Sequence, residues 1–133
     1  RHERVNRYEA DYPSSKPSVY LSCHINAGGG SYGAYFYDHR SSLGPDLAAA
    51  IADEVDLPGI SAAKTLPASP GDWTSNAYNT IKDVRRPVSI CLEPFFLDNP
   101  AHQRYMDVDK IYLVGEAIAN GIHSWYISQG EQP

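Results

Sequence analysis

Two short apolar segments, each ending beside a residue with acid–base chemistry, constrain the fold of this chain more than any other feature. SVYLSCHI runs from Ser18 to Ile25, and VSICLE runs from Val88 to Glu93. Both segments are dominated by residues that favour buried β-strands. A third strand is expected at Gly33–His39, where the sequence reads GAYFYDH. Helical patterns lie between and after these strands, and this alternation indicates an α/β fold.

The helical patterns differ in their signals. A helix is expected over residues 41–56, because Pro45 suits a first turn and an apolar residue recurs every four positions at Leu43, Leu47, Ile51 and Val55. Residues 1–12 also read as helical. The stretch 57–76 reads as a loop that exposes Trp73, and residues 77–82 (AYNTIK) read as a short strand.

A long closing helix is expected near the C-terminal end of the sequence. Asn99 and Pro100 have the chemistry of a helix cap followed by a first-turn proline. The apolar face of this helix is expected to comprise Ile111, Gly115, Ile118, Ile122 and Trp125.

Size and charge exclude several classes of function. With 133 residues, the chain is expected to form one domain over 1–133. The net charge is −5, and basic residues cluster only in RHER at the start and at Arg85-Arg86. A nucleic-acid partner is therefore not expected, because phosphate backbones require a concentrated basic face. The apolar stretches are too short to span a bilayer.

The two cysteines are expected to be buried free thiols, because Cys23 and Cys91 both lie in apolar strand segments. Cys23 and His24 do not form a nucleophilic dyad in this interpretation. Adjacent side chains of a strand point to opposite faces of the sheet, so the thiol and the imidazole face apart.

His24 is the histidine best placed for function, since it ends the strongest strand and precedes a glycine loop. Ligands of α/β proteins gather at the carboxyl ends of strands. From the residues alone, a structural histidine and a ligand are equally good interpretations. His102 and His123 read as surface residues, His2 reads as frayed, and His39 is open to either interpretation.

Glu93 is likewise open to a structural or a functional interpretation. Burial of a carboxylate at the end of an apolar strand costs free energy unless the group is paired, protonated or facing a cleft. It marks either the exit of the strand into solvent or a general base with a raised pKa. If the two strands are parallel neighbours, His24 and Glu93 share one edge of the sheet. Gly28, Gly29 and Gly30 suit either a flexible loop or a close approach of the backbone to a ligand.

Two blocks of sequence resemble zinc-dependent N-acetylmuramoyl-L-alanine amidases. YLSCHINA, with its glycine loop and GAYFYDH, is similar to the second motif block of that family. RPVSICLEPFFLDNPAHQRYM resembles its last block, and VGEAIANGIHSW its closing helix. The resemblance begins near Arg4, keeps the order of the blocks and implies a mainly parallel sheet with helices on both faces.

The resemblance also implies a site and a reaction. His24 would be a zinc ligand, Glu93 the catalytic glutamate, and Asn26 and Ala27 would shape the substrate site. Family members use zinc-activated water to cleave the amide between N-acetylmuramic acid and L-alanine in peptidoglycan. This activity implies a secreted, periplasmic or cell-wall protein, or a phage lysin, and the sequence does not distinguish autolysin from endolysin.

The first motif block, which carries the family's other zinc ligands, has no counterpart in the sequence. The chain therefore resembles the C-terminal two-thirds of a catalytic domain that lacks its first strand and helix. Such a sheet is expected to need a further N-terminal segment or an oligomer to cover its edge. Two alternatives stay open: a non-catalytic wall- or partner-binding module of the same fold, and another zinc hydrolase that uses Arg85 or Arg86 to bind a substrate carboxylate.

Overall fold

A four-stranded mixed sheet forms the centre of the molecule. The computed structural model describes residues 1–11 and 14–130. The strands are β1 (Val19–Cys23), β2 (Tyr32–Asp38), β3 (Ser61–Ala68) and β4 (Val88–Glu93), in the spatial order β1-β4-β2-β3. β1 and β4 are parallel, as are β2 and β3, while β4 and β2 are antiparallel. The sheet is thus mostly parallel, as expected.

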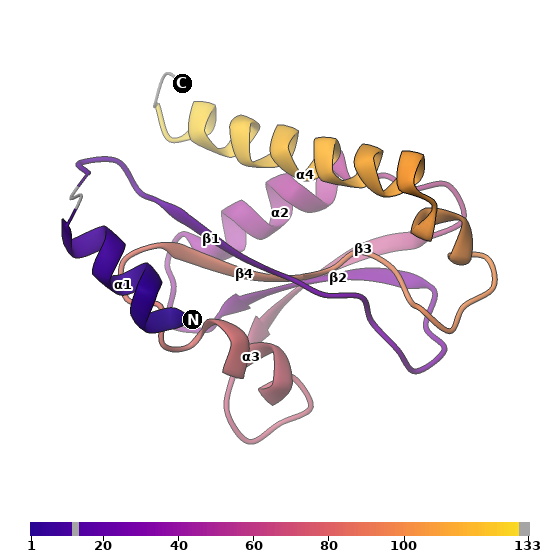
Figure 1. The fold of residues 1–133 in the computed structure, drawn as a ribbon, viewed down its shortest axis with the longest axis horizontal. Coiled ribbons are helices and arrows are strands. Elements are labelled where there is room, and N and C mark those ends of the chain that lie inside the picture. Colours follow the sequence, from indigo (N-terminus) through magenta and orange to yellow (C-terminus); the bar gives the residue numbers. More distant parts are fainter. Residues whose placement is uncertain (12–13, 131–133) are drawn as a thin grey trace.

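Helices cover both faces of this sheet (Figure 1). α2 (Gly44–Glu54) and α4 (Val108–Ser128) lie on one face, and α1 (His2–Asp11) and α3 (Ser75–Ile81) lie on the other. A short 3-10 helix, η1 (Gln103–Met106), precedes α4. The predicted α/β class with helices on both faces is confirmed. Within the described residues, no helix has both the length and the apolar character needed to cross a bilayer.

The larger core lies between the sheet and the helix pair α2 and α4. Its fully buried residues include Leu47 and Ile51 from α2, Leu92 from β4 and Trp125 from α4. The predicted apolar stripe of α2 is confirmed, since Val55 is also buried in this core. Burial of these aliphatic and aromatic side chains is the main force that holds α2 and α4 on the sheet.

The smaller core lies under α3 on the opposite face. Ala77, Tyr78 and Ile81 of α3 pack with Phe36 of β2 and Cys91 of β4. α1 has no buried residue of its own. It is joined to the segment after α3 by polar contacts: the Asn6 side chain donates to the Asp83 carbonyl at 2.8 Å and accepts from the Arg85 amide at 3.0 Å.

Two predicted elements were wrong. Residues 61–68 form the strand β3 rather than a loop, and residues 75–81 form the helix α3 rather than a short strand. Among the described strands, β3 lies at the edge of the sheet and pairs only with β2, which explains why it accommodates an exposed Pro67. In α3, the buried residues Ala77, Tyr78 and Ile81 lie on one helical face.

The start of the closing helix was also predicted too early. The Asn99 side chain accepts from the Ala101 amide and so caps a turn, whereas α4 begins after Asp107, whose carboxylate accepts from the Asp109 amide at 3.3 Å. Trp125 is buried on the predicted face, with Ile118 and Ile122 partly buried, but the other buried positions are Val114 and Gly121. Ile111 and Gly115, expected on the same face, are exposed.

Candidate functional site

The parallel pairing of β1 with β4 brings His24 and Glu93 to one edge of the sheet. The pairing ends at Cys23 opposite Leu92, and the His24 amide donates to the Leu92 carbonyl at 2.8 Å. The next residue of each strand is therefore His24 on one side and Glu93 on the other. We call these two residues and the strand ends that carry them the His24–Glu93 rim. The conditional prediction that they share one edge of the sheet is confirmed.

Both side chains project from the face of the sheet that α3 covers. Ser22 and His24 lie on the same face of β1, and the Ser22 hydroxyl is 3.0 Å from Nε2 of His24. Cys91 and Glu93 are on the corresponding face of β4, where Cys91 packs in the α3 core. The imidazole is thus held next to the carboxylate by the strand geometry and by a neighbouring hydroxyl.

Cys23 faces the other way, as expected, but it is not buried. It lines an apolar groove of about 320 Å³ with Leu92 of β4 and with Ile111 and Ile118 of α4. The thiol is exposed, whereas Cys91 is buried. The prediction of a buried thiol was therefore correct for Cys91 and wrong for Cys23, because β1 is an edge strand with no neighbour on its outer side in the described residues.

The environment of Glu93 favours its neutral form. The side chain is half-buried, and burial raises the pKa of Glu93, while the nearby His24 lowers it in part. In the sheet Glu93 lies opposite Ala34, whose small side chain is fully buried. A carboxyl group with a raised pKa is a stronger base than an exposed glutamate, and it can exchange a proton closer to neutral pH.

The loop after His24 is held by backbone and carboxylate contacts. Asn26 forms an isolated parallel bridge with Phe96, and its side chain accepts from the Ala27 amide at 2.8 Å. The Gly28 and Gly29 amides donate to the Asp98 carboxylate at 2.8 and 3.0 Å. Gly28 and Gly29 have φ angles of 117° and 74°, which L-residues rarely adopt.

Two residues that shape this loop were missed by sequence reasoning. Asp98 lies 69 and 70 positions after the glycines that it binds, so no local pattern marks the contact. His102, predicted to be a surface residue, is fully buried, and its Nδ1 accepts from the Phe96 amide at 3.0 Å. The polar neighbours of His102 in the sequence gave no sign of this burial, because it follows from tertiary packing.

The remaining histidines lie away from the His24–Glu93 rim. Nε2 of His2 lies 2.7 Å from the Thr80 carbonyl. The prediction that His2 is frayed was therefore wrong. His39 is structural, since its Nδ1 donates to the Ala68 carbonyl at 3.0 Å. His123 is exposed on α4, as predicted.

The donors at the rim do not by themselves fit a zinc site. Protein zinc sites use at least three protein ligands, usually His, Cys, Asp or Glu. Among residues 1–11 and 14–130, no group of three such side chains is close enough to hold a metal ion. Arg85 and Arg86 precede β4 and lie at its opposite end, so they cannot bind a substrate carboxylate beside Glu93.

Comparison with solved structures shows a likeness in fold. The fold resembles that of the CwlD amidase from Clostridioides difficile, solved in complex with the GerS lipoprotein. The TM-score is 0.67 at 19% sequence identity, and the match covers 96% of this chain. The chain spans 60% of the length of that structure. No protein-family profile matches the sequence, and no curated protein matches it.

The likeness establishes the fold, and the chemistry of the site has to be inferred from the residues of this chain. At the end of two parallel strands, this fold places an imidazole and a half-buried carboxyl group next to an ordered glycine loop. That arrangement can hold a water molecule and move one of its protons. It can also hydrogen-bond a polar ligand that lies along the rim.

Proposed function

We propose that the chain carries the catalytic glutamate and one ligand histidine of a peptidoglycan amidase. The observation that carries the proposal is that His24 and Glu93 lie at the neighbouring ends of two parallel strands. The CwlD-like fold and the order of the two sequence blocks support the same assignment. The reaction proposed is hydrolysis of the amide between N-acetylmuramic acid and L-alanine, with peptidoglycan as the substrate.

Glu93 is assigned the role of proton carrier in this reaction. It accepts a proton from a water molecule whose oxygen attacks the amide carbonyl carbon. The C–N bond then breaks, and Glu93 passes the proton to the leaving nitrogen of L-alanine. The products are the free lactyl carboxylic acid and a stem peptide with a new amino terminus. The raised pKa of Glu93 supports this role, because a base is most effective when its pKa is near the working pH.

A zinc ion at this site would need further ligands from outside the described residues. His24 would supply one ligand, and the metal would polarise the amide carbonyl and the attacking water. No group of three His, Cys, Asp or Glu side chains that could hold a metal ion is present among the described residues, and Glu93 is assigned to proton transfer, so His24 would need at least two further ligands to complete the site. Metal analysis of the 133-residue chain after dialysis is expected to find far less than one zinc per chain. Full occupancy would contradict the assignment of one ligand to this chain.

Asn26 and Ala27 are assigned to the substrate side of the site. The Asn26 side chain is engaged by the Ala27 amide, so it orders the loop rather than reaching into solvent. Ala27, Gly28 and Gly29 are exposed next to His24 and carry no bulky side chain, and their amides are held by Asn26 and Asp98. We propose that substrate lies along this backbone. Action on peptidoglycan places the protein at the cell wall, as a secreted, periplasmic or phage-encoded enzyme.

The test uses the polypeptide that carries this sequence in its natural length. Release of soluble fragments from purified peptidoglycan is measured for the wild type, Glu93→Gln and the control Glu116→Gln, which alters an exposed glutamate of α4. Glu93→Gln is expected to lower the rate at least about 100-fold, the range for loss of a general base. Glu116→Gln should match the wild type. An unchanged rate in Glu93→Gln would refute the assigned role.

A second candidate is a non-catalytic module of the same fold that binds wall glycopeptide. The observation that favours it is the lack of a three-donor metal group among the described residues. In that case the wild type sediments with peptidoglycan without releasing fragments, and a metal chelator leaves the binding unchanged. Fragment release that depends on Glu93 excludes this alternative.

A further inference from the structure

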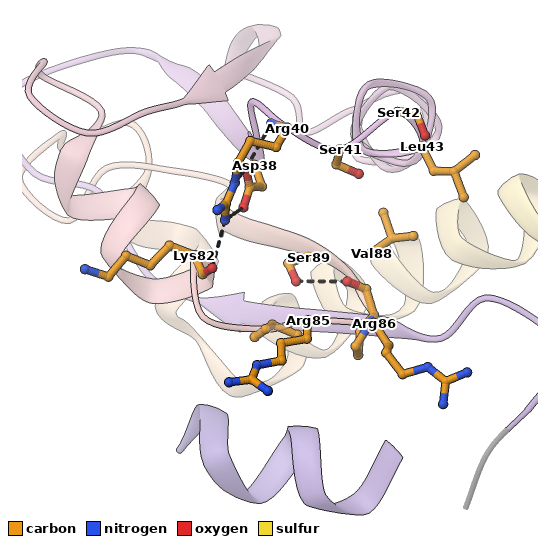
Figure 2. A pocket seen from close by; sticks show the side chains of 12 residues that line it. Asp38, Arg40, Ser41, Ser42, Leu43, Lys82, Arg85, Arg86, Val88 and Ser89 are labelled. Atoms are coloured by element: carbon orange, nitrogen blue, oxygen red, sulfur yellow. Dashed lines mark hydrogen bonds and ion pairs between the residues drawn. The ribbon is translucent and has the colours of Figure 1, made fainter. Parts of the chain in front are cut away.

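A second hollow lies at the opposite end of β4 from Glu93. It has a volume of about 480 Å³ and is formed by the end of β2, the loop before α2 and the segment between α3 and β4 (Figure 2). β4 is 6 residues long, so at about 3.3 Å per residue it separates this hollow from the rim by roughly 17 Å. We call it the basic pocket. The proposed amidase chemistry does not use it.

The charge of the basic pocket is opposite to that of the chain. Its lining holds the cationic side chains Arg40, Lys82, Arg85 and Arg86 and one carboxylate, Asp38. These residues carry a net charge of +3 in a chain whose total is −5, so the rest of the chain carries −8. Cations gathered in this way attract anions to one end of an otherwise acidic molecule.

Most of this positive charge is not neutralised by neighbours. Asp38 pairs with Arg40 at 2.6 Å. In the part of the chain that the structure describes, no ion pair joins Lys82, Arg85 or Arg86 to a carboxylate. Arg86 makes only a long contact of 3.4 Å with the Glu9 carbonyl. Three cationic side chains of the lining therefore have no carboxylate partner among the described residues.

The side chains and hydroxyls around the pocket suit a group with several acceptor oxygens. Figure 2 shows Lys82, Arg85 and Arg86 extending from one short segment in different directions, with their charged ends apart. Ser41 and Ser42 line the same hollow. The Ser41 oxygen accepts from the Gly44 amide at 2.9 Å, which leaves its O–H free to donate.

The lining of the basic pocket also bears on whether the anion could carry a nucleobase. None of the residues around the basic pocket is aromatic. Proteins that bind single-stranded nucleic acid stack bases on aromatic side chains, so the lining offers no place for a base. Arginine forks pair with phosphate oxygens in two parallel hydrogen bonds. We propose that the basic pocket binds a phosphate group of a ligand that carries no nucleobase, independently of the His24–Glu93 rim.

The test is a binding titration at low salt, in which binding is measured by calorimetry. The probes are inorganic phosphate, a glycerol-phosphate oligomer, a glutamate oligomer of equal charge and a single-stranded oligonucleotide. The double variant Arg85→Gln/Arg86→Gln is compared with Arg104→Gln/Lys110→Gln, which removes the same charge from exposed residues near α4. Arg85→Lys/Arg86→Lys keeps the charge and removes the guanidinium forks. Circular dichroism checks that each variant is folded.

Phosphate-bearing probes are expected to bind the wild type, with affinity reduced about tenfold or more in Arg85→Gln/Arg86→Gln, as loss of charge-assisted hydrogen bonds implies. The control double variant should bind as the wild type does. If inorganic phosphate and the glycerol-phosphate oligomer bind with equal affinity per phosphate, the ligand of the pocket is free phosphate. If the glycerol-phosphate oligomer binds more tightly, the ligand is a phosphate-bearing polymer. The proposal is overturned by no phosphate binding, by equal loss in the control, by equal binding of the glutamate oligomer, or by preference for the oligonucleotide.

Discussion

Gly121 is the position where a single added methyl group should separate α2 from α4. A Cβ at this glycine would lie 2.5 Å from Cα of Ile51 and 2.8 Å from the Ala50 carbonyl oxygen. Both atoms belong to the backbone of α2, so neither can rotate away. Because carbon atoms pack at about 3.5–4.0 Å, Gly121→Ala forces the two helices apart by about 1 Å.

The expected cost follows from two opposing effects. Overpacking of a core costs about 1–3 kcal/mol, and contact with rigid backbone places this case near the upper value. Alanine is favoured over glycine inside a helix by about 1 kcal/mol. The net expectation for Gly121→Ala is a loss of about 2 kcal/mol in the free energy of unfolding.

Gly115 provides a matched control in the same helix. A Cβ at Gly115 would meet no atom within 4 Å, so Gly115→Ala should gain helix propensity and raise stability by up to about 1 kcal/mol. Urea unfolding followed by circular dichroism at neutral pH measures both variants. The difference between them should be about 3 kcal/mol, the sum of the two effects. If Gly121→Ala is at least as stable as Gly115→Ala, the described packing of α4 on α2 is wrong.

Three further variants test buried polar groups. Because burial holds the pKa of Glu93 above its unfolded value of about 4.3, the folded protein loses stability as the pH rises through that range. The stability of Glu93→Gln relative to the wild type, measured by urea midpoints, should therefore increase between pH 3.5 and pH 7. A stability difference that does not change with pH would contradict the raised pKa. Burial alone would raise the pKa of Asp38, but the hydrogen bonds and charge of Arg40 outweigh it and hold this pKa below its ordinary value. The wild type should exceed Asp38→Asn in stability at pH 7, and the difference should shrink as the pH falls below about 4; a difference that persists at pH 3 speaks against the ion pair. His102→Ala leaves the buried Phe96 amide without its acceptor and opens a cavity, so unfolding should require about 2–3 kcal/mol less. A loss under about 1 kcal/mol would show that this amide finds another partner.

The strands and helices with strong periodic patterns could be predicted from the sequence. β1, β2 and β4 combine β-branched, aromatic and aliphatic residues, and α2 carries an apolar stripe that meets the core at Leu47 and Ile51. β3 could not be recognised, because SAAKTLPA is small and polar and becomes a strand through pairing with β2. α3 was misread for a related reason, since its seven residues become helical by packing Tyr78 and Ile81 onto the sheet.

The candidate site was predictable where strand geometry decides it. The proximity of His24 and Glu93 could be predicted because the carboxyl ends of neighbouring parallel strands meet at one edge of the sheet. The carboxylate of Asp98 on the glycine loop could not be foreseen, because the contact spans 69 and 70 positions. The basic pocket was visible only as Arg85-Arg86, because Arg40 and Lys82 join it through folding.

Identification of the bond that is cut tests the central claim most directly. Peptidoglycan is digested with the natural-length polypeptide, and the products are identified by mass spectrometry. We expect stem peptides that begin with a free L-alanine amino terminus, glycan chains that keep the lactyl carboxylic acid, and neither product with Glu93→Gln. Cleavage within the glycan chain or the peptide cross-link, or products that persist in Glu93→Gln, would contradict the proposed amidase function of the His24–Glu93 rim.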